Sequence, residues 1–109
     1  MQVITMKDLP TEEQASVSLW KVFEQKNVNG KITMGKVVIP PGERVPLEGA
    51  SIHEQNEYSI VIKGSFIAES GGKQYRINAG DAAFIPAGEE HVAYNDGNEV
   101  CEIVWVLVG

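Results

Sequence analysis

The segment GDAAFIPAGEEHVAYN, residues 80–95, carries the most specific fold signal in this chain. It opens with the turn signal Gly80-Asp81 and continues through four apolar residues to Pro86-Ala87-Gly88, which is a second turn signal. His91 follows three residues later and begins another short run of strand type. The stretch therefore predicts two short strands, residues 81–85 and 91–94, on either side of one tight turn that is followed by a histidine.

The same alternation of turns and short apolar runs extends over most of the chain. Runs rich in Val, Ile, Phe and Tyr lie between Gly, Pro and Asn signals, which is typical of an antiparallel sandwich or barrel. The signals are Asn29-Gly30, Pro40-Pro41-Gly42, Lys63-Gly64, Gly71-Gly72, Gly80-Asp81, Pro86-Ala87-Gly88 and Asn95-Asp96-Gly97. The predicted strands cover residues 18–25, 31–39, 57–63, 65–69, 73–77, 81–85, 91–94 and 100–108.

The N-terminal part is less regular. We expect an edge strand over Met1 to Thr5 and a short helical segment capped by Thr11, with Gln14 three residues later. Residues 1–17 would then precede a barrel over residues 18–108. A chain of 109 residues without an internal repeat is expected to form a single domain.

Charge and composition exclude several classes of partner. The net charge is −6 and the nine Lys and Arg are scattered, so neither nucleic acid nor an acidic membrane surface is an expected partner. Cys101 is the only cysteine, which rules out an intrachain disulfide. Without a secretory signal in Met1 to Pro10 or an apolar run of about 20 residues, we expect a cytoplasmic protein. Because a domain this small buries a modest core, we expect a homodimer.

The chain has only two histidines, His53 and His91. A lone histidine is usually an ordinary surface or core residue. However, Ser51, His53, Gln55 and Glu57 alternate along the chain, so an extended backbone would point them to one face. Two imidazoles and one carboxylate that converge inside a barrel would make a divalent-metal site.

At this point the sequence resembles the cupin superfamily. Residues 80–95 match its second motif, G-x5-P-x-G-x2-H-x3-N, at every fixed position. The end of its first motif, G-x5-H-x-H-x3-4-E-x6-G, fits His53, Glu57 and Gly64. The resemblance covers Pro40 to about Leu107 and implies an all-β, single-domain antiparallel barrel, the double-stranded β-helix that resembles a jelly roll.

The departures from the first motif bear on function. Ser51 stands where the family has its first histidine, and Val45 where it has a glycine. The resemblance therefore implies three metal ligands, His53, Glu57 and His91, with Ser51 at the usual fourth-ligand position. The ion would be Fe, Mn, Zn or Ni, and Gln55 or Glu48 could compensate for the missing imidazole.

Three functions fit these residues. A metalloenzyme acting on a small polar molecule, of the dioxygenase or isomerase and lyase kinds, is the leading one, since two His and one carboxylate leave coordination positions open. The alternatives are a small-molecule binding or sensing module and a barrel that has lost its metal, with the three residues in a hydrogen-bonded cluster. Glu102 would be a possible general base if it pointed inward. Trp105 is expected in the barrel core or a dimer contact, and Asn95 at a turn or a strand end.

Overall fold

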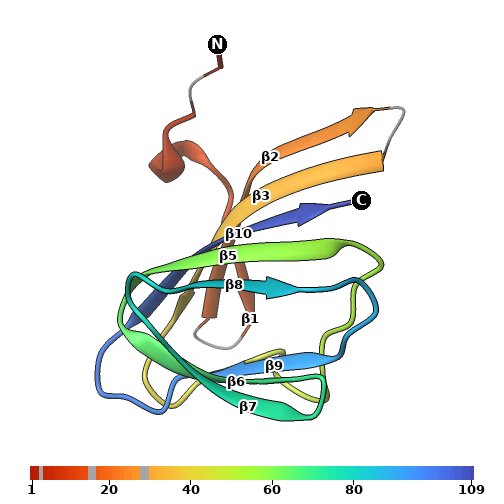
Figure 1. The fold of residues 1–109 in the computed structure, drawn as a ribbon. Coiled ribbons are helices and arrows are strands. Elements are labelled where there is room, and N and C mark those ends of the chain that lie inside the picture. Colours follow the sequence, from red (N-terminus) through yellow and green to blue (C-terminus); the bar gives the residue numbers. More distant parts are fainter. Residues whose placement is uncertain (3, 15–16, 28–29) are drawn as a thin grey trace.

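The computed structural model describes residues 1–2, 4–14, 17–27 and 30–109. Two antiparallel sheets face each other and enclose the space between them (Figure 1). The six-stranded sheet has the order β1-β2-β3-β10-β5-β8, and the four-stranded sheet has the order β4-β9-β6-β7. The strands are β1 (Glu12–Gln14), β2 (Val17–Asn27), β3 (Gly30–Ile39), β4 (Arg44–Val45), β5 (Asn56–Lys63), β6 (Ser65–Ser70), β7 (Lys73–Asn78), β8 (Ala82–Ile85), β9 (His91–Tyr94) and β10 (Cys101–Val108).

The core forms where alternate residues of the two sheets meet. In β3, the residues at 33, 35, 37 and 39 are buried while those between them are more exposed, which is the period of two that a half-covered strand requires. Ile103 on β10 lies opposite Val37 on one side and Val61 on the other. The buried cluster as a whole is Val17, Val37, Ile39, Val61, Phe66, Ala68, Cys101 and Ile103.

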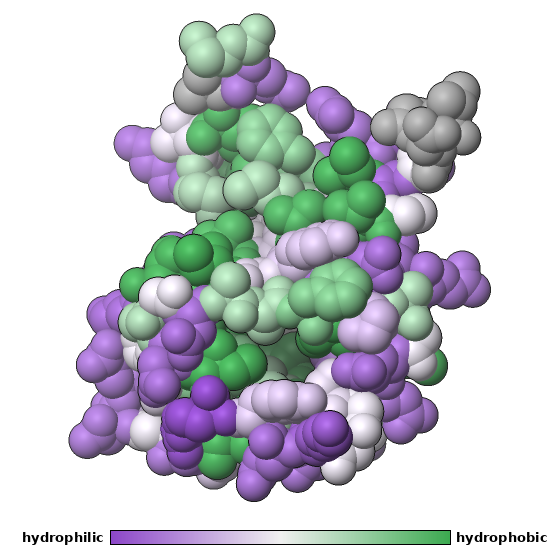
Figure 2. Space-filling model, viewed as in Figure 1, coloured by the Kyte–Doolittle hydropathy of each residue, from purple (hydrophilic) through white to green (hydrophobic). Residues whose placement is uncertain are grey.

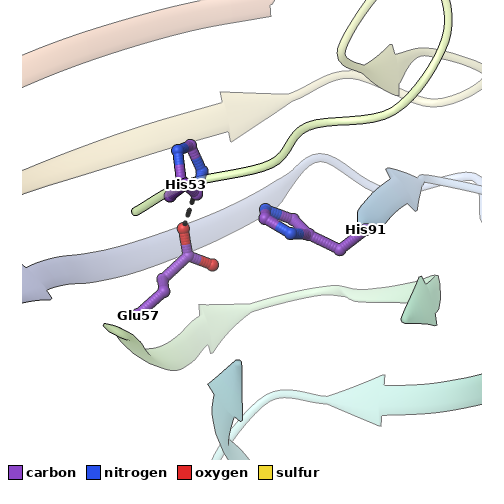
Figure 3. A group of neighbouring side chains, drawn as sticks. All are labelled: His53, Glu57 and His91. Carbon is purple, nitrogen blue, oxygen red and sulfur yellow. Dashed lines mark ion pairs between the residues drawn. The ribbon is translucent and has the colours of Figure 1, made fainter. Parts of the chain in front are cut away.

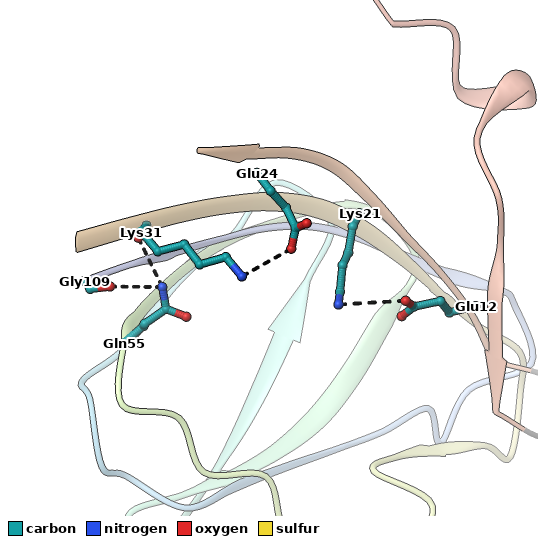
Figure 4. Close-up of polar contacts among 6 residues, drawn as sticks. All are labelled: Glu12, Lys21, Glu24, Lys31, Gln55 and Gly109. Carbon is teal, nitrogen blue, oxygen red and sulfur yellow. Dashed lines mark hydrogen bonds and ion pairs between the residues drawn. The ribbon is translucent and has the colours of Figure 1, made fainter. Parts of the chain in front are cut away.

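The C-terminus is joined to the start of β3 by hydrogen bonds. The Gln55 side-chain amide donates to the carbonyl oxygens of Lys31, at 3.1 Å, and Gly109, at 3.2 Å (Figure 4). Lys31 and Gly109 also pair through their backbones. Gln55 therefore has a structural partner and does not reach the predicted metal ligands.

The N-terminal prediction was wrong in its elements. A 3-10 helix covers Met6–Asp8, and the expected helical segment at Thr11 to Gln14 is instead strand β1, which pairs with β2. The described residues of Met1 to Thr5 carry no strand. In the predicted Asn29-Gly30 turn, Asn29 lies outside the described residues, while Asn27 and Gly30 pair on either side.

The remaining strands agree with the prediction to within a few residues, apart from β4, which is only two residues long and pairs with β9. In the part of the chain that the structure describes, the helix Met6–Asp8 is far too short to span a bilayer.

Candidate metal centre

Three separate segments bring His53, Glu57 and His91 together (Figure 3). His53 lies in the connection between β4 and β5, Glu57 is the second residue of β5, and His91 begins β9. One ligand atom from each side chain lies within 4.8 Å of the other two. The two imidazole rings have centroids 5.0 Å apart. The structure thus places the three predicted ligands in one cluster between the sheets.

The Pro86-Ala87-Gly88 turn holds the segment that carries His53. The Gly88 amide donates to the His53 carbonyl at 2.7 Å, and the Ala87 amide donates to the Asn56 side-chain oxygen at 2.9 Å. Gly88 has φ +83°, a conformation that favours glycine. The turn therefore has a plain structural function, which is to fix the backbone on both sides of the ligand segment.

His91 is held through its backbone and its ring. Ser51 and His91 exchange two backbone hydrogen bonds of 2.9 Å each, which places Ser51 directly across from His91. The Nδ1 atom of His91 lies 3.1 Å from the Glu89 carbonyl oxygen. Because a carbonyl only accepts, Nδ1 carries the proton and leaves the Nε2 lone pair free for a metal ion.

Burial and charge at Glu57 also suit a cation. The Glu57 side chain is only 19% exposed, and burial raises the pKa of its carboxyl above the ordinary value, an effect that the His91 and His53 imidazoles partly offset. Its Oε1 atom lies 3.7 Å from Nε2 of His53, too far for a hydrogen bond. Two ligand atoms bound to one tetrahedral ion at about 2.1 Å lie about 3.4 Å apart. The donor set and its spacing therefore fit a divalent ion better than a hydrogen-bonded cluster.

The three ligands line a cavity of about 820 Å³ between the two sheets. Figure 2 shows its opening as a hollow with hydrophobic side chains in its wall. Ser51 also lines the cavity, and both sheets contribute to it. A volume of this size accommodates an organic molecule beside the ligand cluster.

Comparison with known families agrees with this geometry. The Cupin domain family matches residues 35–107, which is more than half of the chain. The chain belongs to the cupin family. Among solved structures, this cupin is similar to a predicted oxalate decarboxylase from Thermotoga maritima (TM-score 0.80, 21% identity, 98% of each chain covered). It is also similar to the polyketide cyclase RemF from Streptomyces resistomycificus (TM-score 0.79, 19% identity, 98% of this chain and 78% of that one). At these identities the likeness shows the fold alone.

One curated protein matches part of the sequence of this cupin. The endoribonuclease YbeY of Myxococcus xanthus is 31% identical over 70 residues, which are 64% of this chain. The chain spans only 23% of the length of that relative.

Two residues that the sequence suggested for this cupin, Glu102 as a general base and Glu48 as a substitute metal ligand, lie away from the site. Glu102 does not point inward, because it pairs with Lys36 at 2.7 Å and does not line the cavity. Glu48 is exposed in the loop after β4, whose Leu47 and Gly49 carbonyls accept hydrogen bonds from Arg44. Trp105 packs against the core and lines the cavity, which confirms the expectation of a barrel-core residue.

Sequence reasoning missed Glu89 and Ser70, which also line the cavity. The Ser70 hydroxyl donates to Oε2 of Glu89 at 2.6 Å, and Ser70 lies across from His91 in the pairing of β6 with β9. The alternation of Glu89 with His91 could have indicated one shared face. Ser70 could not have been found this way, because it depends on strand pairing between distant segments.

Proposed function

We propose that this cupin is a divalent-metal enzyme that acts on a small molecule held in the cavity. The observation that carries the proposal is the convergence of His53, Glu57 and His91 within 4.8 Å at the wall of a cavity large enough for a substrate. Such a cluster offers three ligands and leaves other coordination positions for the reacting molecule.

The roles of the residues follow from their contacts. His53, Glu57 and His91 would hold the ion, and the proton on Nδ1 of His91 keeps its Nε2 available. A bound divalent ion supplies positive charge that stabilises negative charge on a substrate oxygen, and a redox-active ion also supplies electrons. Ser51 is small beside His91 and leaves space where the family usually has an imidazole. The apolar wall keeps water away from the bound molecule.

The reaction class depends on the ion. Iron would favour an oxygenase, whereas zinc, manganese or nickel would favour isomerase or lyase chemistry at a carbonyl. The names of the structural neighbours, a predicted oxalate decarboxylase and a polyketide cyclase, are compatible with the second group.

Elemental analysis of protein purified without a metal-affinity tag tests the proposal. The parent should hold close to one divalent ion per chain, and His91→Ala and Glu57→Gln should lose it. Glu54→Gln is the matched control, because Glu54 is an exposed carboxylate three residues before Glu57 and does not line the cavity. We expect its metal content to equal that of the parent.

The natural serine at position 51 supports a second candidate function, a metal-free binding or sensing barrel. It stands where the family usually has a histidine, so one imidazole of the usual ligand set is missing. If the parent holds no metal after incubation with Fe(II), Mn(II), Ni(II) and Zn(II) in turn, the enzyme proposal fails and this second function is the better account. Equal metal content in the parent and in His91→Ala would also contradict the proposed site.

A further inference from the structure

The wall of the cavity changes from polar to apolar along β6. Ser70 lies across from His91, so this end of β6 is next to the metal ligands. Ala68 and then Phe66 follow on the same face, and Phe66 pairs with Ile77 of β7. Four strand residues correspond to about 13 Å, so the wall becomes apolar over that distance from the ligands.

Several polar side chains gather at the end of the cavity that holds His91, and the charged residues Glu12, Lys21, Arg76 and Asp81 line it elsewhere. Ser51 and Ser70 lie across from His91 on its two sides, and Glu89 accepts a hydrogen bond from Ser70. Elsewhere most of the wall is hydrocarbon from both sheets. These apolar residues include Leu19, Val37, Ile39, Val45, Phe66, Ala68, Ile77, Ala93, Ile103, Trp105 and Leu107.

Positive charge for an anionic ligand is scarce. Among the described residues that line the cavity, only Lys21 and Arg76 are cationic, apart from the histidines. Lys21 pairs with Glu12 at 3.8 Å (Figure 4), and Arg76 donates two hydrogen bonds to Asp96, at 2.7 Å and 2.5 Å. The two side chains are 48% and 46% exposed, so they lie at the rim where water screens them.

The interior has acidic groups instead. Glu57 and Glu89 both line the cavity. A divalent ion bound to the Glu57 carboxylate keeps one net positive charge, and the Glu89 carboxylate lies close to the same site. A ligand with two negative charges would leave buried charge without a partner, which is costly.

We infer that the ligand of this cavity is a largely apolar organic molecule that is uncharged in free solution and carries two neighbouring oxygen atoms at one end. The oxygen-bearing end lies at Ser51, Ser70 and the metal ligands, and the apolar body lies along Ala68 and Phe66. The inference of an apolar body depends only on the cavity wall. The inference of a chelating end depends on the proposed metal function. This class differs from the small polar molecule that the sequence suggested and excludes small dicarboxylates.

Titration calorimetry with two probes tests the ligand class. The protein is loaded with Zn(II), which is redox-inert, and titrated with 2,3-dihydroxynaphthalene and with oxalate. Both probes present neighbouring oxygens, but only the diol is apolar and uncharged in free solution at neutral pH, and any hydroxyl proton that it loses on binding the ion goes to the buffer. We expect the diol to bind at least tenfold more tightly. Oxalate binding as tight as or tighter than the diol overturns the inference.

Variants that fill the apolar part of the cavity locate the binding site. Ala68→Leu should weaken diol binding at least tenfold and leave the zinc content unchanged. Ala79→Leu makes the same change at an exposed turn residue outside this cavity and should have no effect. If Ala68→Leu does not fold, as judged by circular dichroism, Ala93→Val adds less volume to the same wall. Unchanged diol affinity in a folded wall variant contradicts the inference.

The outcomes separate this inference from the proposed function. A protein that holds zinc but prefers oxalate retains the metal function and loses the ligand class. A protein that holds no zinc, yet binds the diol in a manner sensitive to Ala68→Leu, loses the metal function and retains the apolar ligand class. If the diol binds neither form, the ligand class is wrong.

Discussion

Asn95, the last residue of the second motif, has a fully buried side chain that joins three segments. Its amide nitrogen donates to the carbonyls of Ile39 and Glu99, each at 2.8 Å, and its oxygen accepts from the Gly97 amide at 3.0 Å. The side chain thus satisfies the Ile39 carbonyl, which would otherwise lie buried without this partner, and two backbone groups of the following loop. This agrees with the expectation of a turn residue and gives the motif position a structural cause.

We predict that Asn95→Ala lowers the free energy of unfolding by about 1–3 kcal/mol, because it removes the partner of the buried Ile39 carbonyl and the bond to the Glu99 carbonyl. Urea denaturation followed by circular dichroism measures the change. Asn98→Ala is the control, since Asn98 is exposed in the same loop and should change stability by less than about 0.5 kcal/mol. Equal effects of the two substitutions on stability would refute this structural role of the Asn95 side chain.

Cys101 is fully buried, and its surroundings disfavour the thiolate. Burial, with a smaller contribution from the negative charge of Glu102, raises the pKa of the Cys101 thiol to about 11. We predict that the native thiol reacts with iodoacetamide at pH 8 at least tenfold more slowly than the urea-unfolded chain. Comparable rates in the two states, measured by mass spectrometry, would show that the thiol is accessible.

The same shift sets the direction of a pH effect on stability. The thiol of the unfolded chain ionises near its ordinary pKa of about 8.5, well below the folded pKa of about 11. The unfolded state therefore gains stability from ionisation as the pH rises through this window, and the folded protein loses stability relative to it. Cys101→Ala should flatten the decline in the free energy of unfolding between pH 8.5 and 11. An unchanged slope would contradict the prediction.

Among the strands, β3 and β10 come unusually close at one position, where a glycine faces a tryptophan. Gly35 lies across from Trp105, and a Cβ at Gly35 would lie 2.3 Å from Cζ2 of Trp105 and 2.4 Å from the Trp20 carbonyl oxygen. The lack of a side chain on β3 is what allows the indole to lie over that strand and line the cavity.

We predict that Gly35→Ala destabilises the barrel by about 1–3 kcal/mol, because both the ring and the β2 backbone must move. Thermal and urea unfolding measure the loss, and Trp fluorescence reports displacement of the indole. Gly97→Ala serves as a control, since a Cβ there has its nearest contact at an ordinary 3.4 Å. A fully stable Gly35→Ala with an unchanged spectrum would show that the strands can separate freely.

The N-terminal error shows where local patterns fail. The spacing of Thr11 and Gln14 resembles a helix cap, but Glu12 pairs with Leu19 of β2 and also forms an ion pair with Lys21. These partners lie seven or more residues away and outweigh a weak local preference. By contrast, the turns around β5 to β9 are specified by Gly and Pro within each turn, so their strands could be predicted closely.

On the whole-molecule scale, one face of the six-stranded sheet exposes large apolar side chains. Residues of β5 alternate between this face and the interior, where Ser59 lines the cavity and Val61 is buried. The Tyr58 and Phe84 rings also pack against each other, with centroids 5.1 Å apart. The exposed side chains and their exposed fractions are Tyr58 (48%), Ile60 (45%), Ile62 (51%) and Phe84 (54%).

We propose a second copy of the chain as the partner for this face. A half-exposed aromatic side chain offers about 100 Å², and a stable interface needs about 800 Å² from each partner. Val104 and Val106 of β10, which pair with Ile60 and Tyr58, extend the apolar area toward β3. A twisted sheet face packs well on its own copy about a two-fold axis. This face would replace the Met1 to Thr5 seam that the sequence suggested.

We predict that the protein is a dimer with about twice the chain mass of 11.9 kDa, measured by light scattering after size-exclusion chromatography. The double substitution Ile60→Lys and Phe84→Lys should give a folded monomer, because it buries charge in the interface. Ile52→Lys places a single lysine at an exposed loop residue away from the sheet, and this variant should remain a dimer. A monomeric parent, or a dimer that survives the double substitution, would rule out this interface.

The positions of the turns between strands, the family resemblance and the three candidate ligands could all be predicted from the amino-acid sequence. These properties depend on residue type at short spacing, where glycine, proline and the alternation of side chains act locally. Three features are evident only in three dimensions: Glu102 points away from the cavity, Ser70 and Glu89 join its polar end, and most of its wall is apolar. Those features depend on which strands pair and in which register, and pairing between distant segments is set by the packing of the whole barrel.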